Sequence, residues 1–221
     1  MSITSPIIPA IIPQSYADLM IQIGKISGLP EVHVDVVDGL FVPNISWPYN
    51  DNDNIDVTSA YEVLAPFSLE VDLMVDKPLI AAHAWLKAGA DQLVFHIETI
   101  SISALKDFTD THDVTVGVAV SSATPLENLY PYLAVADYVQ VMGIAKIGAQ
   151  GQPFDESVIS RVVTLSDKFP HVPISMDGSV NVATLSRLKL LKLHRFIVGS
   201  AIMGVVNPKD AYSTLTKILQ S

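Results

Sequence analysis

The stretch Glu31-Val32-His33-Val34-Asp35-Val36 decides the fold, because valines alternate in it with residues that carry polar side chains. Residues two apart on a β-strand point to the same side, so the valines form one face while His33 and Asp35 lie on the other. The valine face suits packing against helices. The opposite face carries an imidazole and a carboxylate, which are costly to bury without partners. The pattern therefore predicts a strand between a layer of helices and a polar interior.

Similar β-rich runs recur along the whole chain and alternate with stretches that have the apolar spacing of helices. The predicted strands are Pro6–Ile12, Glu31–Val36, Ser68–Met74, Gln92–His96, Thr115–Val120, Tyr138–Met142, Pro173–Asp177 and Arg195–Gly199. The predicted helices are Tyr16–Ile26, Leu79–Ala88, Ser101–Phe108, Glu156–Lys168, Ala183–Leu191 and Pro208–Leu219. This alternation within 221 residues predicts an α/β protein with a single parallel (β/α)8 TIM barrel.

The organisation of the chain favours one barrel over two alternatives. No Pro/Ser-rich linker or charge block interrupts the alternation, so we expect residues 1–221 to form one domain. An open doubly wound sheet is the competing α/β fold, but the Gly-x-Gly-x-x-Gly motif that follows its first strand is absent. Active centres of (β/α)8 barrels lie at the C-terminal ends of the strands, so polar residues there are the candidates for a site.

The composition excludes several classes of function. The chain has no cysteine, which excludes disulfides, thiolate nucleophiles and cysteine-ligated zinc. Its net charge of −10 opposes binding to nucleic acid or to an anionic membrane, so a phosphorylated substrate would need backbone donors. The first basic residue is Lys25 and no apolar run approaches about 18 residues, so we expect neither a signal peptide nor a membrane span and predict a cytoplasmic protein.

Acidic side chains on three predicted strands indicate a metal site. The alternation of strand residues puts Asp72 and Asp177 on the same inner surface as His33 and Asp35, provided that these faces turn inward. Carboxylates that close would raise one another's pKa values unless a cation held them, so one divalent metal bound by all four residues is the simplest interpretation. Two alternatives are a buried, purely structural His33–Asp35 pair, and an Asp72 or Asp177 that faces solvent at a turn.

Three glycine-bearing loops at the same end of the strands predict an anion site. Gly178-Ser179 follows the seventh strand and Gly199-Ser200 follows the eighth, each before a helix whose N-terminus offers free N–H groups. A long loop after the sixth strand carries Gly148 and Gly151, which suggests a lid or a ligand-binding loop. Helix capping at the Gly-Ser pairs and an irregular surface loop are the alternatives.

The segment Val32-His33-Val34-Asp35-Val36-Val37-Asp38-Gly39-Leu40-Phe41-Val42-Pro43-Asn44 resembles the signature of ribulose-phosphate 3-epimerases, His-x-Asp-x-Met-Asp-Gly-x-Phe-Val-Pro-Asn. Further similarity occurs at Leu73–Val75, Gly89–Asp91, Phe95–Glu98, Val141–Met142, Gly151–Phe154, Asp177–Gly178 and Gly199–Ile202, and so spans nearly the whole chain. The resemblance implies a metal-dependent isomerase of the pentose phosphate pathway, which interconverts D-ribulose 5-phosphate and D-xylulose 5-phosphate by inversion at C3.

The resemblance also implies roles for individual residues. Asp35 and Asp177 match aspartates that bind the metal and act as the two acid/base groups on either side of an enediolate. Met74 and Met142 match methionines that line the reaction site. The expected cofactor is one divalent ion (Mn, Mg, Fe, Co or Zn), and the expected partner is a small phosphorylated sugar. The expected substrate-binding residues are Met74, Met142, Gly148, Gly151, Gly178, Ser179, Gly199 and Ser200. Barrels of this size often associate, so a homo-oligomer is a further expectation.

The chain departs from the family pattern at several positions. Asp72 stands where the family has a second metal-binding histidine, Glu70 replaces an aspartate, Val37 a methionine, Ala10 a serine and Ser179 a glycine. A carboxylate in place of an imidazole makes the set of metal ligands one charge more negative. This change should weaken the Lewis acidity of the ion and favour hard ions, such as manganese or magnesium, over zinc. We therefore expect slow epimerase activity that is better with manganese.

Other functions remain open from the sequence. The departures at Asp72, Ala10 and Val37 are also compatible with a barrel that binds a phosphosugar with little or no catalysis. An epimerase that acts on a ketohexose 6-phosphate is a second alternative. A phosphosugar decarboxylase or aldolase of the same barrel superfamily is disfavoured, because the Asp-x-Lys-x-x-Asp pattern expected on the third strand is missing.

Overall fold

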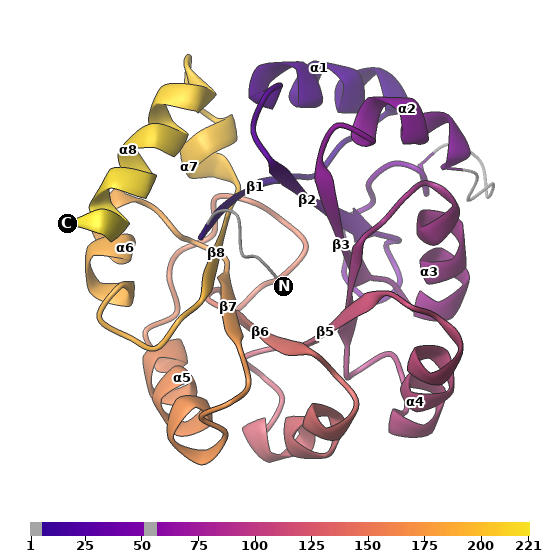
Figure 1. Ribbon diagram of the computed structural model, residues 1–221, viewed down its shortest axis with the longest axis vertical. Helices are drawn as coiled ribbons and strands as arrows, with labels where there is room; N and C mark the ends of the chain where they lie inside the picture. Colours follow the sequence, from indigo (N-terminus) through magenta and orange to yellow (C-terminus); the bar gives the residue numbers. More distant parts are fainter. Residues whose placement is uncertain (1–5, 51–56) are drawn as a thin grey trace.

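A computed structural model describes residues 6–50 and 57–221 and shows a closed barrel of parallel strands (Figure 1). Within these residues the strands follow one another round the barrel in chain order, and the last pairs with the first. They are β1 (Ile7–Ile11), β2 (Glu31–Val37), β3 (Ser68–Met74), β4 (Gln92–His96), β5 (Thr115–Val120), β6 (Tyr138–Met142), β7 (Ile174–Asp177) and β8 (Arg195–Val198). The predicted (β/α)8 barrel is therefore confirmed. Residues 1–5 and 51–56, which belong to the expected domain, lie outside the described residues.

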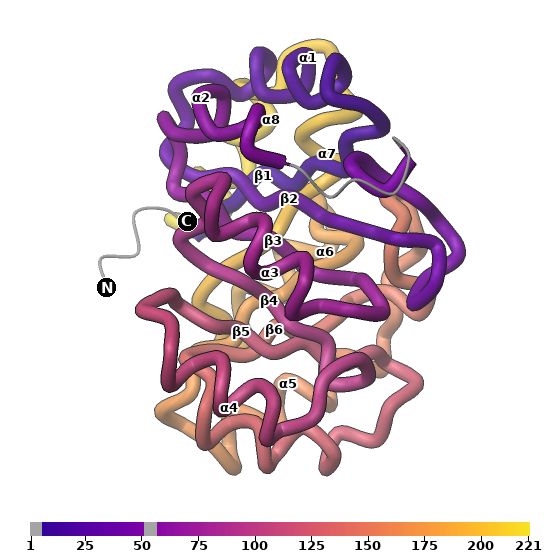
Figure 2. The backbone as a smooth tube through the Cα atoms, turned by 90° about the vertical axis from the view of Figure 1, so that its right-hand side faces the viewer, coloured from indigo at the N-terminus to yellow at the C-terminus, as the bar shows by residue number. Residues whose placement is uncertain are grey.

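Helices surround the barrel, as Figures 1 and 2 show from two directions. The α-helices are α1 (Tyr16–Ile26), α2 (Tyr61–Leu64), α3 (Pro78–Lys87), α4 (Ile102–Thr111), α5 (Ser157–Lys168), α6 (Val182–Leu188), α7 (Ser200–Met203) and α8 (Pro208–Gln220). Two 3-10 helices lie at Thr58–Ala60 and Leu126–Ala134. The sequence pattern missed α2, α7 and both 3-10 helices. Helices α2, α7 and Thr58–Ala60 are too short to repeat an apolar spacing, and Pro131 interrupts the 3-10 helix at Leu126–Ala134. None of the described helices is both long enough and apolar enough to span a membrane.

The two faces of each strand lie in different environments. Val34 on β2 belongs to the main hydrophobic cluster, together with Leu19 of α1 and Trp85 of α3. His33 and Asp35 lie on the opposite face of the same strand and are buried inside the barrel. The alternation seen in the sequence thus separates an apolar shell between strands and helices from a polar interior.

Strand register determines which polar residues become neighbours. In the pairing of β2 with β3, His33 lies opposite Glu70 and Asp35 lies opposite Asp72. In the pairing of β6 with β7, Met142 lies opposite Asp177. Asp35, Asp72, Met142 and Asp177 lie toward the carboxyl ends of their strands, which is where barrels of this type carry their sites, and His33 and Glu70 lie one layer deeper.

A tyrosine ring occupies the barrel interior on the amino-terminal side of this layer. Tyr138 lies opposite Gly117 in the register of β5 and β6 and is almost completely buried. A Cβ atom on Gly117 would lie 2.5 Å from Cε2 of the ring. The absence of a side chain at this strand position is therefore a packing requirement.

We expect Gly117→Ala to destabilise the protein by about 1–3 kcal/mol, because the added methyl group overpacks the interior against Tyr138. The matched control is Gly24→Ala on α1, where an added Cβ has no atom within 4 Å. Alanine favours a helix over glycine, so the control should be neutral or more stable. Urea denaturation measures both values, and equal stability of the two variants would contradict the packing requirement.

Candidate metal and anion site

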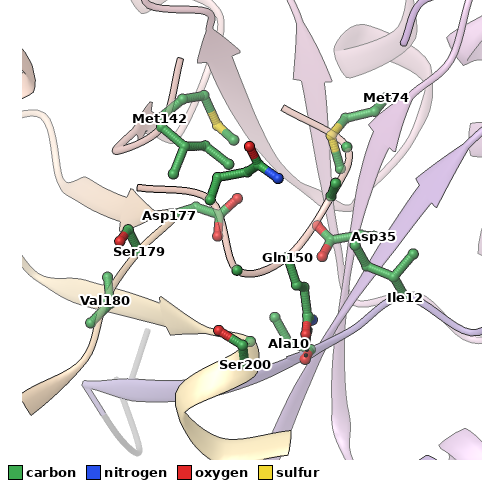
Figure 3. Close-up of a pocket in the computed structure, with 17 residues that line it drawn as sticks. Ala10, Ile12, Asp35, Met74, Met142, Gln150, Asp177, Ser179, Val180 and Ser200 are labelled. Atoms are coloured by element: carbon green, nitrogen blue, oxygen red, sulfur yellow. Dashed lines mark hydrogen bonds between the residues drawn. The ribbon is translucent and has the colours of Figure 1, made fainter. Parts of the chain in front are cut away.

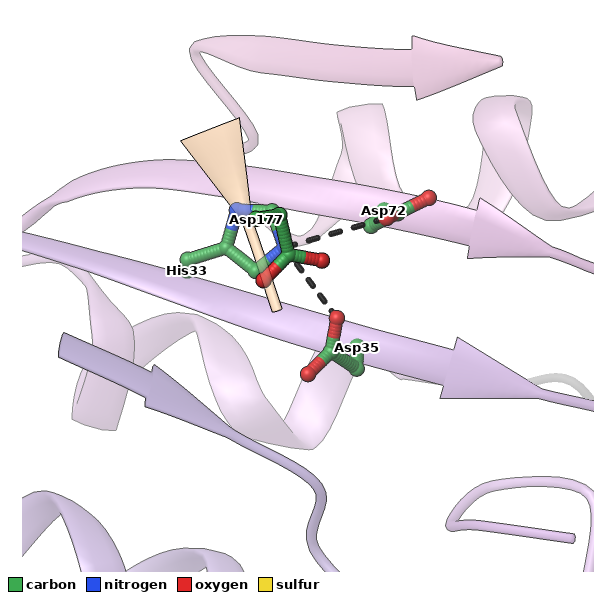
Figure 4. A group of neighbouring side chains, drawn as sticks. All are labelled: His33, Asp35, Asp72 and Asp177. Carbon is green, nitrogen blue, oxygen red and sulfur yellow. Dashed lines mark hydrogen bonds and ion pairs between the residues drawn. The ribbon is translucent and has the colours of Figure 1, made fainter. Parts of the chain in front are cut away.

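Four side chains from three strands come together at the carboxyl end of the barrel (Figure 4). Each offers one ligand atom, and these atoms all lie within 4.8 Å of one another; the residues are His33, Asp35, Asp72 and Asp177. Asp72 is 0% exposed, so the alternative in which it faces solvent is wrong. The structure thus brings together the residues that the strand pattern put on one surface, and their role as metal ligands stays a prediction.

The His33 imidazole is held by carboxylates at both nitrogens. Its Nε2 lies 3.1 Å from Oδ1 of Asp35 and 4.0 Å from Oδ2 of Asp72. Its Nδ1 lies 2.6 Å from Oε1 of Glu70, which is itself buried. In the sequence Glu70 was noted only as a departure from the family pattern, and its contact with His33 depends on the β2–β3 register.

Asp72 has two polar neighbours that the sequence analysis did not assign to the site. His96 on β4 lies with its Nε2 3.0 Å from Oδ1 of Asp72, and Nε2 of Gln140 on β6 donates to Oδ2 at 2.7 Å. Burial lowers the pKa of His96, but the Asp72 carboxylate raises it, and the pKa lies above its usual value. Both residues sit at inward strand positions, and this parity is the signal that could have found them.

The electrostatics of the cluster indicate a site for a cation. Burial raises the pKa of Asp35, although the neighbouring His33 opposes that effect. Burial also raises the pKa of Asp177 well above its usual range, and the charge of Asp35 raises it further. Carboxylates that resist ionisation in this way are stabilised by a bound divalent ion, and three oxygen donors with one imidazole suit a hard one.

A cavity lies directly beside the cluster (Figure 3). Asp35 and Asp177 face it, and it opens to solvent. All eight residues that the sequence analysis assigned to substrate binding line it: Met74, Met142, Gly148, Gly151, Gly178, Ser179, Gly199 and Ser200. The structure places them together, and their contacts with a substrate stay a prediction.

The loop after β7 differs from the expected helix N-terminus. Gly178 and Ser179 have φ values of 101° and 54°, so two successive residues lie in the left-handed region. Helix α6 starts only at Val182, and the Asn181 side chain accepts the N–H groups of Ala183 and Thr184. The expectation of free N–H groups at this helix is therefore wrong, because a capping box satisfies them. Donors for an anion must come from the backbone before the cap.

The loop after β6 lies across the mouth of the barrel, as the salmon segment in Figure 1 shows. Nδ2 of Asn44 donates to the carbonyl oxygen of Gly148 at 2.9 Å. Nε2 of Gln150 donates to the carbonyl oxygen of Ala10 at 3.0 Å, and a Cβ on Gly199 would lie 2.6 Å from the Gln150 carboxamide. Gln150 was not predicted from the sequence. The loop thus lies over both the cluster of His33, Asp35, Asp72 and Asp177 and the loop after β8.

The fold and the site define a (β/α)8 barrel that carries its polar groups at the carboxyl ends of the strands, the arrangement of barrel enzymes. A sequence model of the ribulose-phosphate 3 epimerase family matches residues 6–203, and the chain belongs to that family. The resemblance carried by residues 32–44 is therefore confirmed, and with it the expectation of an enzyme of the epimerase class.

Named relatives align along most of the chain. The ribulose-phosphate 3-epimerase of Mycobacterium leprae is 28% identical, and the alignment covers 96% of this chain and 93% of that protein. The chloroplastic ribulose-5-phosphate-3-epimerase of Arabidopsis thaliana is 29% identical over 92% of this chain and 73% of its own length. Among solved structures, 3-hexulose-6-phosphate synthase from Salmonella typhimurium superposes with a TM-score of 0.72 at 15% identity, covering 97% of this chain and 98% of its own. That likeness shows the fold alone.

The pKa of Asp177 makes the stability of the metal-free protein depend on pH. Because the pKa of Asp177 is higher in the folded than in the unfolded state, the contribution of Asp177 to the free energy of unfolding is complete at low pH. This contribution is lost as the pH rises through the pKa of the folded state. Asp177→Asn abolishes that loss. We expect the metal-free variant to gain stability over the wild type, and to gain more at pH 8 than at pH 5. Urea denaturation in EDTA measures the free energy of unfolding of both proteins. A stability gain of the variant that shrinks as the pH rises would contradict the raised pKa of Asp177.

Proposed function

We propose that the chain inverts C3 of D-ribulose 5-phosphate to give D-xylulose 5-phosphate, in line with the names of its relatives. The observation that carries the proposal is the pair Asp35 and Asp177, which come from different strands and face one cavity (Figure 3). A homo-oligomeric, cytoplasmic enzyme stays our expectation.

Inversion at a carbon requires a base on one face and an acid on the other. Asp35 and Asp177 supply two carboxyl groups on separate walls of the cavity. In the metal-free protein burial raises the pKa of both groups, and a bound cation would favour their ionised form, in which a carboxylate can accept a proton. One residue would remove the proton at C3, and the other would return a proton from the opposite side.

The four clustered side chains fit a hard divalent cation, since they offer three carboxylates and one imidazole. His33, Asp35, Asp72 and Asp177 would hold it. When bound, such an ion supplies positive charge that stabilises the oxygens of an enediolate. The hydrogen bonds that Asp72 accepts from His96 and Gln140 would fix the orientation of that ligand.

The remaining residues of the cavity suit a small phosphorylated sugar. Gly178 and Ser179 form a left-handed turn whose backbone would face a phosphate, and Gly199 and Ser200 line the same cavity. Met74 and Met142 would provide apolar contacts on either side of the reacting carbon. The loop after β6 contributes Gly148, Gln150 and Gly151 to the wall of the cavity, so its movement would change the access of a sugar phosphate to the site.

Incubation with D-ribulose 5-phosphate in D2O, followed by NMR of the sugar, tests the proposal. We expect manganese-loaded protein to form xylulose 5-phosphate with deuterium at C3. Asp35→Asn and Asp177→Asn should each lower the rate by about 10²–10⁴-fold, because each removes one proton carrier. Asp110→Asn, at an exposed carboxylate, is the control that should keep the rate. Saturable binding without deuterium exchange would select a non-catalytic phosphosugar-binding barrel instead.

The choice of metal depends on Asp72. We expect the wild type to turn over faster with manganese than with zinc, because three carboxylates favour a hard ion. Asp72→His makes the ligand set one charge more positive and should shift the manganese-to-zinc ratio of rates toward zinc. Turnover of the metal-stripped and reconstituted proteins measures both ratios. Equal or better turnover of the wild type with zinc would rule out the predicted preference.

A further inference from the structure

Glu70 on β3 lies in the barrel interior, directly beneath the cluster of His33, Asp35, Asp72 and Asp177. It is 1% exposed and lies two residues before Asp72 on the inward face of the strand. Its Oε1 lies 2.6 Å from Nδ1 of His33, which is the nitrogen that points away from Asp35 and Asp72. Glu70 therefore contacts the cluster through one atom and is absent from the ligand set.

The second oxygen of Glu70 is held from the opposite side. Nη1 of Arg195 on β8 donates to Oε2 at 2.5 Å, and the hydroxyl of Tyr138 on β6 donates to the same oxygen. Arg195 is fixed in turn, since it donates to Gln92 at 3.0 Å and to Glu31 at 3.2 Å. With donors on both oxygens, the carboxylate of Glu70 has one available orientation.

This orientation determines how His33 can act. A neutral imidazole carries one proton, and the nitrogen without the proton is the one that binds a metal. A carboxylate accepts hydrogen bonds and donates none when ionised, so Nδ1 next to Glu70 must carry the proton. Nε2 faces the aspartates and in the metal-free protein contacts the Asp35 carboxylate at 3.1 Å, so a bound cation would take the place of the proton there while Nδ1 keeps its own.

We propose that Glu70 is a positioning residue that fixes the tautomer and the ring orientation of His33 for metal binding, and that Arg195 and Tyr138 hold Glu70 in place. The proposal rests on the proposed function, because it assumes a divalent cation at His33. Histidines that bind metals commonly donate their other nitrogen to a carboxylate, and loss of that partner weakens metal affinity about 10–100-fold. The structural alternative is an ion-pair network that only fills the base of the barrel.

Glu70→Gln separates these two roles. The amide keeps the size of the side chain, but next to Arg195 and Tyr138 its oxygen takes the place of Oε2, which turns the NH2 group toward Nδ1 of His33. Nδ1 must then accept a hydrogen bond, and the proton moves to Nε2. The matched control is Glu31→Gln, which removes a carboxylate partner of the same Arg195 and leaves the contact between Glu70 and His33 in place.

The experiment measures Mn²⁺ binding to EDTA-stripped protein by calorimetry, and the protonation of Nδ1 and of Nε2 of His33 by ¹⁵N NMR of the metal-free protein. We expect about 10–100-fold weaker binding in Glu70→Gln with the proton on Nε2, and a change of less than about threefold in Glu31→Gln with the proton on Nδ1. If Glu70→Gln does not fold, Glu70→Gln combined with Arg195→Met removes both members of the buried pair and still takes the partner away from His33.

The outcomes separate this inference from the proposed function. Wild-type protein that does not bind Mn²⁺ would overturn both. Wild-type binding that folded Glu70→Gln retains within threefold, with Nδ1 still protonated, would overturn the role of Glu70 and leave the proposed function intact. Equal weakening by Glu70→Gln and Glu31→Gln, with no change of tautomer, would assign the network to structure alone.

Discussion

The parallel pairing of β2 with β3 places Asp35 beside Asp72 and His33 beside Glu70, and the rest of the site depends on how this concentration of negative charge is held. Toward the base of the barrel the Arg195 guanidinium offsets the negative charge of Glu70. Burial alone would raise the pKa of Glu70, but Arg195 and His33 lower it to about 2. Toward the mouth, no lysine or arginine lines the cavity within the described part of the chain. There the imidazoles of His33 and His96 face the carboxylates; burial lowers their pKa values, but the neighbouring carboxylates raise them, so both can carry positive charge in the metal-free protein.

Much of this arrangement follows from the sequence, because strand periodicity is a local property. The alternation in residues 31–36 gave the inward face of β2 correctly, and the same parity brought Asp72 and Asp177 to one cluster. What could not be predicted is contact between strands far apart in the chain. The Arg195–Glu70 pair spans 125 residues, and whether the two side chains meet depends on barrel closure and rotamers. The cap at Asn181 was also missed, since a Gly-Ser pair gives no indication of where the next helix begins.

The substitution at Asp72 has a different meaning in the structure than in the sequence. A carboxylate in place of an imidazole adds one negative charge when ligands are counted in isolation. In the folded chain both oxygens of Asp72 accept hydrogen bonds, from His96 and Gln140, which draw electron density away from the cavity. The exchange is therefore accompanied by polar partners on two further strands. In the proposed enzyme those partners, together with Asp72, would determine how strongly the site polarises a substrate.

The loop after β6 affects the rate of the reaction as well as its chemistry. Its two side-chain hydrogen bonds, from Asn44 to Gly148 and from Gln150 to Ala10, connect it to the loop after β2 and to β1, on the opposite side of the mouth. Gly148 and Gln150 both line the cavity that Asp35 and Asp177 face, so these hydrogen bonds hold the loop beside the proposed substrate site. In the proposed reaction, any opening of the loop for substrate entry or product release would have to break both hydrogen bonds. The lifetime of these two surface hydrogen bonds would then set the upper limit of the turnover rate.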